Sequence, residues 1–207
     1  MMSTVSFTRM RDGTQADYDL LHHYEQEFIN GLADRVLDHL KMLDGSLGGY
    51  QISRFEHSLQ SATRAQADGA DIDWIVTALL HDMGDTLSPM NHDSMAAAIL
   101  APYVREECTW VLKHHGIFQL RYYGAKVGAD PESRAKYIDD PNYESCVTFC
   151  ERWDENCFDP TYKSAPLSHF EPMVRQVFAR KAWDPAVLQP GVQVPMIVES
   201  AKVAASA

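Results

Sequence analysis

Apolar residues recur at intervals of three and four along most of this chain, and no stretch alternates apolar and polar residues as a β-strand does. This spacing is typical of amphipathic helices, each of which buries one apolar stripe against other helices. It predicts helices over 24–43, 52–68, 71–84, 92–101, 104–115, 143–155 and 167–180, and a polar loop with a short helical piece over 122–141. The fold is therefore predicted to be all-α.

No linker, internal repeat or low-complexity tract interrupts the helical pattern, so we expect a single helical bundle, placed over residues 24–184. Residues 1–23 are then an N-terminal extension. Residues 185–207 are rich in proline and small residues, and they are expected to form an extended or disordered C-terminal arm.

Charge narrows the partners that the chain can have. Lys and Arg number 18 against 29 Asp and Glu, and the formal net charge of −11 is spread along the chain. Nucleic acids require a basic surface and are not expected, whereas a small charged ligand is compatible if a metal or local cations offset the field. The apolar runs fall short of the roughly 20 residues of a membrane span, and residues 1–13 lack the apolar segment of a secretory signal. We expect a cytoplasmic protein without a membrane partner.

The four cysteines form no CxxC pair, which fits a reducing compartment. Cys146, Cys150 and Cys157 lie at helical spacing, which suits core packing and, as a less favoured alternative, a soft metal. A buried thiol behaves as a small apolar residue, so the cysteines are interpreted as part of the core.

Histidines and aspartates gather where the predicted central helices begin or end. His81 and Asp82 directly follow the apolar stretch 77–80, and burying a charged carboxylate there is costly unless a partner offsets its charge. A metal ion does this and takes neutral imidazole as a further ligand. Isolated histidines are more often hydrogen-bonded core residues, but here several occur in series, each in or beside an apolar helix. The predicted metal ligands are His57, His81, Asp82, His92, His115 and Asp154.

The series of His57, the pair His81 and Asp82, and the distant Asp154 resembles the HD-domain superfamily, in which such residues lie on an all-α bundle. The resemblance covers about residues 50–155. A minimal HD phosphohydrolase holds one metal, whereas the two further histidines of the series are similar to ligands of the HD-domain diiron oxygenases. The resemblance then implies a Fe(II)/Fe(III) pair bridged by Asp82 and no organic cofactor. One iron would take His57, His81, Asp82 and Asp154, and the other would take Asp82, His92 and His115.

The residues around the ligands resemble the phosphonate-degrading branch of these oxygenases. The stretches Phe-Glu-His-Ser-Leu-Gln, Ala-Leu-Leu-His-Asp-Met-Gly and Trp-Asp-Glu are most similar to this branch. Within the branch, Asn-His-Asp at 91–93 followed by His-His-Gly-Ile-Phe-Gln resembles the enzymes acting on (1-hydroxy-2-(trimethylammonio)ethyl)phosphonate. The resemblance implies a dioxygenase of phosphonate catabolism that takes a small phosphonate and O2 and cleaves the C–P bond to give glycine betaine and phosphate. Two-metal hydrolysis would use the same ligands, so an HD-type phosphohydrolase acting on a phosphomonoester or nucleotide is the alternative. A metal-stabilised helical module without turnover is the third interpretation.

Two residues are expected to take part in the reaction itself. Tyr50 precedes the first histidine of the series, and the resemblance implies that a tyrosine here fills the open metal position until substrate arrives. The alternative is an ordinary half-buried tyrosine at the start of the helix. Asp82 is the second, as the bridging ligand. Glu56, beside His57, is expected near the substrate, with a solvated helix position as the alternative.

A phosphonate needs cationic donors, which Arg and Lys supply. Arg152 is the first choice because it precedes Asp154 by two residues, and a surface ion pair is the alternative. His114, Arg121 and Lys126 are further candidates.

Asp85 stands where many relatives carry a basic residue, and an acid there cannot bind a phosphonate. Our hypothesis is that Asp85 faces the cationic end of the substrate. A quaternary ammonium group is recognised by charge and by aromatic faces, which Phe118, Tyr122, Tyr123 and Tyr50 would supply. The alternative is that Asp85 caps a turn and that the aromatic residues belong to the core.

Overall fold

The computed structural model describes residues 3–198 of the chain, and these residues form helices and no strand. The all-α prediction is confirmed. The α-helices are α1 (Gln15–Asn30), α2 (Leu32–Lys41), α3 (Arg54–Ala67), α4 (Ile72–Leu80), α5 (His92–Leu100), α6 (Glu106–Tyr123), α7 (Tyr143–Phe149), α8 (Leu167–Phe178) and α9 (Pro185–Leu188). The short 3-10 turns are η1 (Met10–Asp12), η2 (Met42–Gly45), η3 (Gly124–Val127) and η4 (Ser133–Tyr137), and a π-helical turn, η5 (Cys150–Asp154), continues α7.

Local sequence determines where the main helices begin. Thr14 caps α1 and Ser53 caps α3, each in a reciprocal capping box with an acidic residue three positions further on. Asp71 caps α4 by accepting a hydrogen bond from a main-chain amide. At the other end of α3, Gly69 adopts a φ of +80°, the left-handed conformation that commonly follows a helix.

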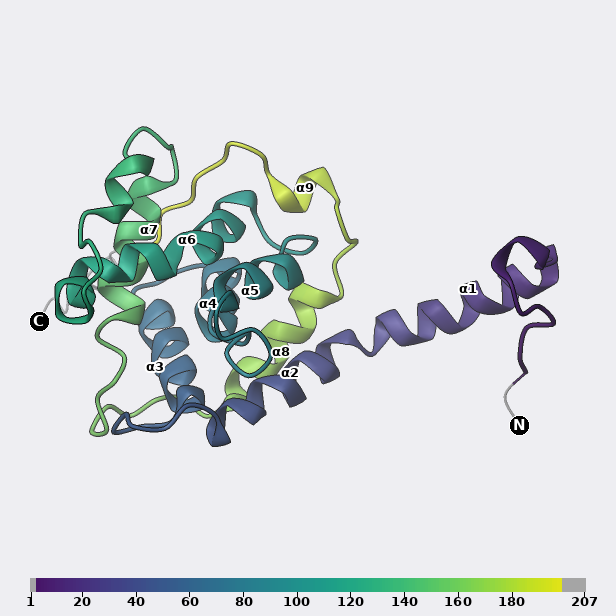
Figure 1. Cartoon of the computed structure of the whole chain (residues 1–207), viewed down its shortest axis with the longest axis horizontal. Helices are drawn as coiled ribbons and strands as arrows, with labels where there is room; N and C mark the ends of the chain where they lie inside the picture. Colours follow the sequence, from purple (N-terminus) through teal and green to yellow (C-terminus); the bar gives the residue numbers. More distant parts are fainter. Residues whose placement is uncertain (1–2, 199–207) are drawn as a thin grey trace, which may run out of the picture.

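The bundle is assembled around α4, whose residues 73–80 are all buried. Helices α3, α6 and α8 contact α4, and α5 packs along α6 (Figure 1). Trp74, Leu79 and Leu80 are fully buried, and each such large apolar side chain contributes roughly 1.5–3 kcal/mol when it leaves water. The four cysteines are buried and unpaired, as expected of core residues.

The N-terminal part of the chain differs from the prediction. The expected helix over 24–43 is instead two helices separated at Gly31, and the first of them starts earlier and projects away from the bundle (Figure 1). Phe28 follows the apolar spacing of this stretch but is 65% exposed, whereas Val36, Leu40 and Leu43 at the same spacing are buried. The proposed boundary at residue 24 therefore falls inside α1.

Helix α6 runs through Gly116 to Tyr123, whereas the sequence led us to expect its end at His115. A glycine inside a helix costs only about 1 kcal/mol relative to alanine, so packing against the core outweighs it. The polar segment that follows contains η3 and η4, in line with the short helical piece that was predicted.

The C-terminal segment returns across the bundle after α9 (Figure 1). We call residues 193–198 the strap. The Val194 amide donates to the Glu107 carboxylate at 3.1 Å, the Val198 amide donates to the Asp68 carbonyl at 2.8 Å, and Met196 is buried. The rest of the predicted arm, residues 199–207, lies outside the described residues. Within the described part of the chain, no helix is both long and apolar enough to cross a membrane.

Candidate metal centre

The six predicted ligands meet at the C-terminal end of α4. Each comes from a different helix or turn, except for the adjacent pair that directly follows α4. All are buried apart from His92, which is 25% exposed. The contributing residues are His57 in α3, His81 and Asp82 after α4, His92 at the start of α5, His115 in α6 and Asp154 at the end of η5.

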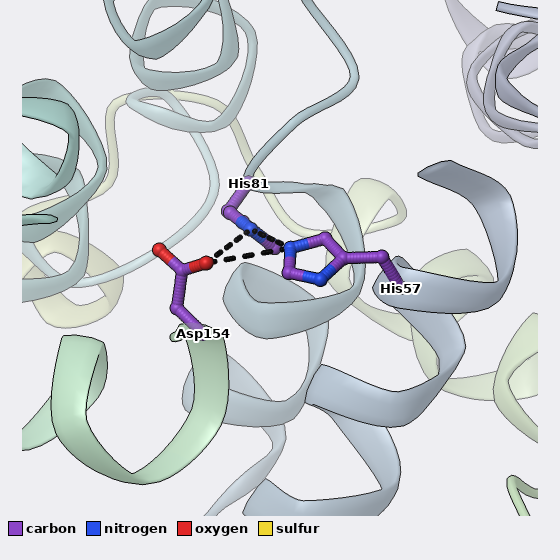
Figure 2. A group of neighbouring side chains, drawn as sticks. All are labelled: His57, His81 and Asp154. Carbon is purple, nitrogen blue, oxygen red and sulfur yellow. Dashed lines mark hydrogen bonds and ion pairs between the residues drawn. The ribbon is translucent and has the colours of Figure 1, made fainter. Parts of the chain in front are cut away.

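Three of these side chains form a closely spaced group (Figure 2). The Nε2 atoms of His57 and His81 lie 3.0 Å apart. Oδ1 of Asp154 lies 3.4 Å from the first nitrogen and 3.6 Å from the second. This group places two nitrogen ligands and one oxygen ligand around a common point.

Asp82 divides its two carboxylate oxygens between two groups of imidazoles. Oδ2 lies 3.2 Å from Nε2 of His57 and 3.1 Å from Nε2 of His81. Oδ1 faces the other way and lies 3.4 Å from Nε2 of His92 and 3.6 Å from Nε2 of His115. The geometry therefore offers two adjacent ligand groups that share one carboxylate.

The histidine rings are fixed from behind by main-chain carbonyl groups. Nδ1 of His57, His81 and His115 lies 2.9, 2.8 and 2.7 Å from the carbonyl oxygens of Cys157, Ala78 and Leu112. Each Nδ1 therefore carries the proton and donates it, so that the Nε2 lone pair faces the centre, which is the arrangement of metal-ligating histidines.

These contacts test whether the residues fit a metal. Two Nε2 lone pairs 3.0 Å apart repel each other unless a cation lies against both. Oδ2 of Asp154 is buried and has no hydrogen-bond partner among the described residues. A metal ion would separate the two lone pairs and would give the Asp154 carboxylate a partner. The residues therefore fit a bound metal.

The charges of the metal-free centre depend on one another. Burial lowers the pKa of His57 and His81, but hydrogen bonds and charge from Asp154 and Asp82 outweigh burial and leave both pKa values raised. Burial raises the pKa of the two carboxyl groups, yet His81 and the other cationic neighbours hold the pKa of Asp82 and Asp154 well below the usual range. A proton on the imidazoles thus occupies the place of a metal cation in the charge balance.

Imidazole and carboxylate ligands without thiolate suit iron, zinc or manganese rather than a soft metal. The ligand groups of the described residues contain no cysteine. Cys157 contributes its carbonyl oxygen to His57, and its thiol donates to the carbonyl of Trp153 at 3.1 Å. The alternative of a soft-metal site at the cysteines is therefore not favoured.

Close packing of the main chain sets the position of His92. Gly84 follows the His–Asp pair and approaches the start of α5 so closely that a Cβ atom there would lie 2.6 Å from the Cα atom of His92. Only glycine allows this approach, because the atom it would meet is backbone rather than a flexible side chain.

A cavity of about 980 Å³ opens onto the centre. Aromatic side chains form much of its wall, and four of the predicted ligands, Asp82, His92, His115 and Asp154, also line it. The aromatic residues of the wall are Tyr50, Tyr122, Tyr123 and Phe158.

The structure brings some of the predicted substrate residues to this cavity. Tyr50 is 49% exposed and stacks on Phe158 with ring centroids 5.0 Å apart, and Phe158 stacks in turn on His57 at 4.3 Å. Tyr122 and Asp85 also line the cavity.

Six other predicted contacts do not line the cavity, and two of them are Arg121 and Lys126. Arg152 is 48% exposed and pairs with Asp68 at 2.6 Å, which is the surface ion pair that was its alternative. The other three are each engaged elsewhere. Glu56 takes part in the capping box of α3, His114 stacks on Trp110, and Phe118 is buried against Tyr137 and Tyr143.

Arg54 and Phe158 are functional candidates that the sequence reasoning missed. Arg54 donates to Asp82 and, at 2.8 Å, to Asp85. A signal existed for Arg54, since it precedes His57 by three positions on a predicted helix and therefore lies on the same side. No local pattern marks Phe158, which reaches the site from a loop.

Comparison with known proteins finds an HD domain over residues 54–150. The matched segment includes His57, His81, Asp82, His92 and His115 and ends just before Asp154. No curated protein matches the chain. The chain thus carries an HD domain, which is an all-α fold, and its clustered histidines and aspartates fit a metal-dependent HD enzyme.

Proposed function

We propose that this HD-domain protein is a dinuclear iron oxygenase that uses O2 to cleave the C–P bond of a 1-hydroxyphosphonate. The observation that carries the proposal is the division of the Asp82 oxygens between two groups of imidazoles. A single-metal hydrolase has no need of the second group. The proposed substrate is (1-hydroxy-2-(trimethylammonio)ethyl)phosphonate, and glycine betaine and phosphate together retain both oxygen atoms of O2.

The iron pair would supply chelation of the hydroxyphosphonate and reductive binding of O2. His57, His81, Asp82 and Asp154 would hold one iron, and Asp82, His92 and His115 the other. The protein's own part is to keep each Nε2 lone pair directed at the centre through the carbonyl groups behind the rings. The buried setting of these ligands also limits the access of water.

The wall of the cavity supports a substrate with a quaternary ammonium end. Such a group has no N–H to donate, and it binds to the faces of aromatic rings. Tyr50, Tyr122, Tyr123 and Phe158 offer such faces above the ligands. Tyr50, half-exposed at this wall, is also our candidate for the side chain that gives way when substrate arrives.

An HD-type phosphohydrolase acting on a phosphomonoester or nucleotide is the second candidate. The observation that favours it is the tight group of His57, His81 and Asp154, which with Asp82 would hold one metal without the rest. In that case His92, which is the most exposed of the six, would not be a ligand.

Metal analysis and oxygen consumption test the proposal. Protein purified without oxygen should hold two irons per chain, and the hydroxyphosphonate should cause O2 uptake with release of one phosphate per O2. A chain that holds zinc, manganese or magnesium and hydrolyses p-nitrophenyl phosphate without O2 would overturn the oxygenase in favour of the hydrolase. The Asp82→Asn variant serves as the inactive control in both assays.

A further inference from the structure

The cavity is rich in carboxylates and poor in cations. Asp82, Asp85, Asp154 and Glu155 line it, and Arg54 is the one Arg or Lys side chain that does so within residues 3–198. Bound metal would take Asp82 and Asp154, which leaves two acids and one arginine to meet a substrate. An anionic substrate group therefore has a single protein cation with which to pair.

Arg54 is held in the cavity by two of these acids. Its side chain is 11% exposed, Nε donates to Oδ2 of Asp85 at 2.8 Å, and Nη2 donates to Oδ2 of Asp82. An arginine guanidinium is not deprotonated in proteins, so Arg54 is cationic throughout the working pH range.

We propose that Arg54 binds the anionic group of the substrate, a tetrahedral phosphonate or phosphate, and that Asp85 positions it. This proposal rests on the proposed function in one respect only, which is that Asp82 binds a metal. Once both Asp82 oxygens ligate metal, the hold of Asp82 on Nη2 weakens while the Nε contact to Asp85 persists. The two Nη groups can then donate together to two oxygens of the anion, the pairing for which a guanidinium is suited.

Asp85 has a second contact that makes it a positioning residue rather than a substrate contact. Its Oδ1 lies 3.5 Å from Nδ1 of His92, while Oδ2 accepts from Arg54. A carboxylate behind a ligating imidazole fixes the ring and its tautomer. The hypothesis that Asp85 faces the cationic end of the substrate is replaced, because both of its oxygens are engaged inside the site.

Calorimetric titration of the metal-loaded protein with methylphosphonate tests the proposal, with the metal content of every variant measured in parallel. Loss of a charge-assisted pair should raise Kd at least about tenfold in Arg54→Gln, and by less in Arg54→Lys, which keeps the charge but not the planar fork. Arg175→Gln is the matched control, because Arg175 is an exposed arginine of α8 that pairs with Asp34. It should leave Kd unchanged, and metal content should stay constant in all three variants.

The two contacts of Asp85 predict a different outcome for Asp85→Asn, which should weaken methylphosphonate binding and also speed the loss of metal to a chelator.

An Arg54→Gln protein that binds methylphosphonate as the unmodified protein does would overturn the proposal. So would one that loses metal in step with affinity, since Arg54 would then be a structural partner of Asp82. Oxygen uptake is not measured, so failure of the oxygenase assignment would leave this binding result intact.

Discussion

At the scale of single residues, the four histidines of the centre differ in what supports them. Main-chain carbonyl groups lie behind His57, His81 and His115, whereas the carboxylate of Asp85 lies behind His92. A carbonyl is neutral and held by the main chain, while a carboxylate adds charge and makes the ring a stronger donor to a metal. Metal binding by His92 is therefore expected to depend more on the residue behind the ring, Asp85, than metal binding by the other three histidines depends on theirs.

Replacing the ligands tests the two groups separately. His92→Ala or His115→Ala should lower the metal content from two ions to about one and abolish turnover, because each removes a ligand from the group that faces Oδ1 of Asp82. Replacing His57, His81, Asp82 or Asp154 should lower it further. Elemental analysis of each purified variant gives the measurement.

His114→Ala is the control for that series. Nδ1 of His114 lies 2.7 Å from the Trp110 carbonyl and its ring stacks on the Trp110 ring, away from the cavity. Metal content should therefore be unchanged. Metal loss at His114 with none at His115 would show that the two adjacent rings had been assigned the wrong way round.

The stability of the metal-free protein should depend on pH through the same residues. The raised pKa values of His57 and His81 mean that their stabilisation is complete below the ordinary histidine pKa of 6.5 and is lost as pH rises through the folded value. The lowered pKa values of Asp82 and Asp154 mean that theirs is present above 3.8 and is lost as pH falls through the folded value.

Both contributions are complete between these two values, so the Tm of metal-free protein should be highest there and should fall as pH rises above 6.5. Metal requires neutral imidazole, so the gain in Tm on adding metal should grow over the same range. Scanning calorimetry with and without a chelator gives both curves. A metal-free Tm that climbs above pH 6.5 would contradict the charge balance described for the centre.

At the scale of elements, the contact between the turn after α4 and the start of α5 places His92. Gly84→Ala should force the two segments apart, because the added Cβ meets the backbone of His92. We expect a destabilisation of about 1–3 kcal/mol, typical of overpacking, together with loss of the metal that His92 holds. Chemical denaturation and metal analysis of the same preparation measure both.

Gly48→Ala provides the comparison for that substitution. A Cβ at Gly48 would meet no atom within 4 Å, and the residue does not have a positive φ. Its stability and metal content should equal those of the unmodified chain. Equal effects at the two glycines would mean that the close approach at Gly84 is not what positions α5.

The ligand series could be predicted from the sequence because each member follows or begins an apolar helix, and burial of a charge there requires compensation. The side of a helix from which a given side chain projects was harder to predict. Arg152 precedes Asp154 by two residues, and residues two apart point to roughly opposite sides of a helix. The side chain of Arg152 therefore points away from the centre that Asp154 faces. His115, Gln119 and Tyr122 follow helical spacing and do line the cavity together.

Contacts made only in the folded chain account for what the sequence did not reveal. The role of Arg54 depends on acids 28 and 31 positions away, and Phe158 reaches His57 from a loop that has no periodic pattern. The continuation of α6 past Gly116 depends on the core, because local propensity alone favours a stop there. The projection of α1 also has no signal in the apolar spacing, which continues unchanged into α2.

At the scale of the whole molecule, the strap connects α6 to the C-terminal end of α3 through Glu107 and Asp68. Met196→Ala should lower the stability by roughly 2 kcal/mol, the low end for a buried methionine, because its side chain packs into the core. Ile197→Ala alters the next side chain, which is exposed, and should have almost no effect. Thermal unfolding of the two variants measures this difference, and similar Tm values would show that the strap does not contribute to the core.

The projecting helix should behave as a separate unit in hydrogen exchange. An isolated helix about as long as α1 is marginally stable in water, and α1 projects away from the bundle (Figure 1). Its amides should exchange orders of magnitude faster than those of α4, whose residues 73–80 are all buried. Equal protection of the two helices would show that α1 is covered in solution.

The carboxylate of Asp82 would also link the two proposed metal sites thermodynamically. Because one side chain serves both, filling either site changes the free energy of filling the other, and reciprocity requires the same factor in both directions. A change at Asp85, which lies against His92 and reaches Asp82 only through Arg54, would therefore also alter the apparent affinity of the site at His57. Metal titrations of this chain should be fitted with an interaction constant rather than as two independent sites.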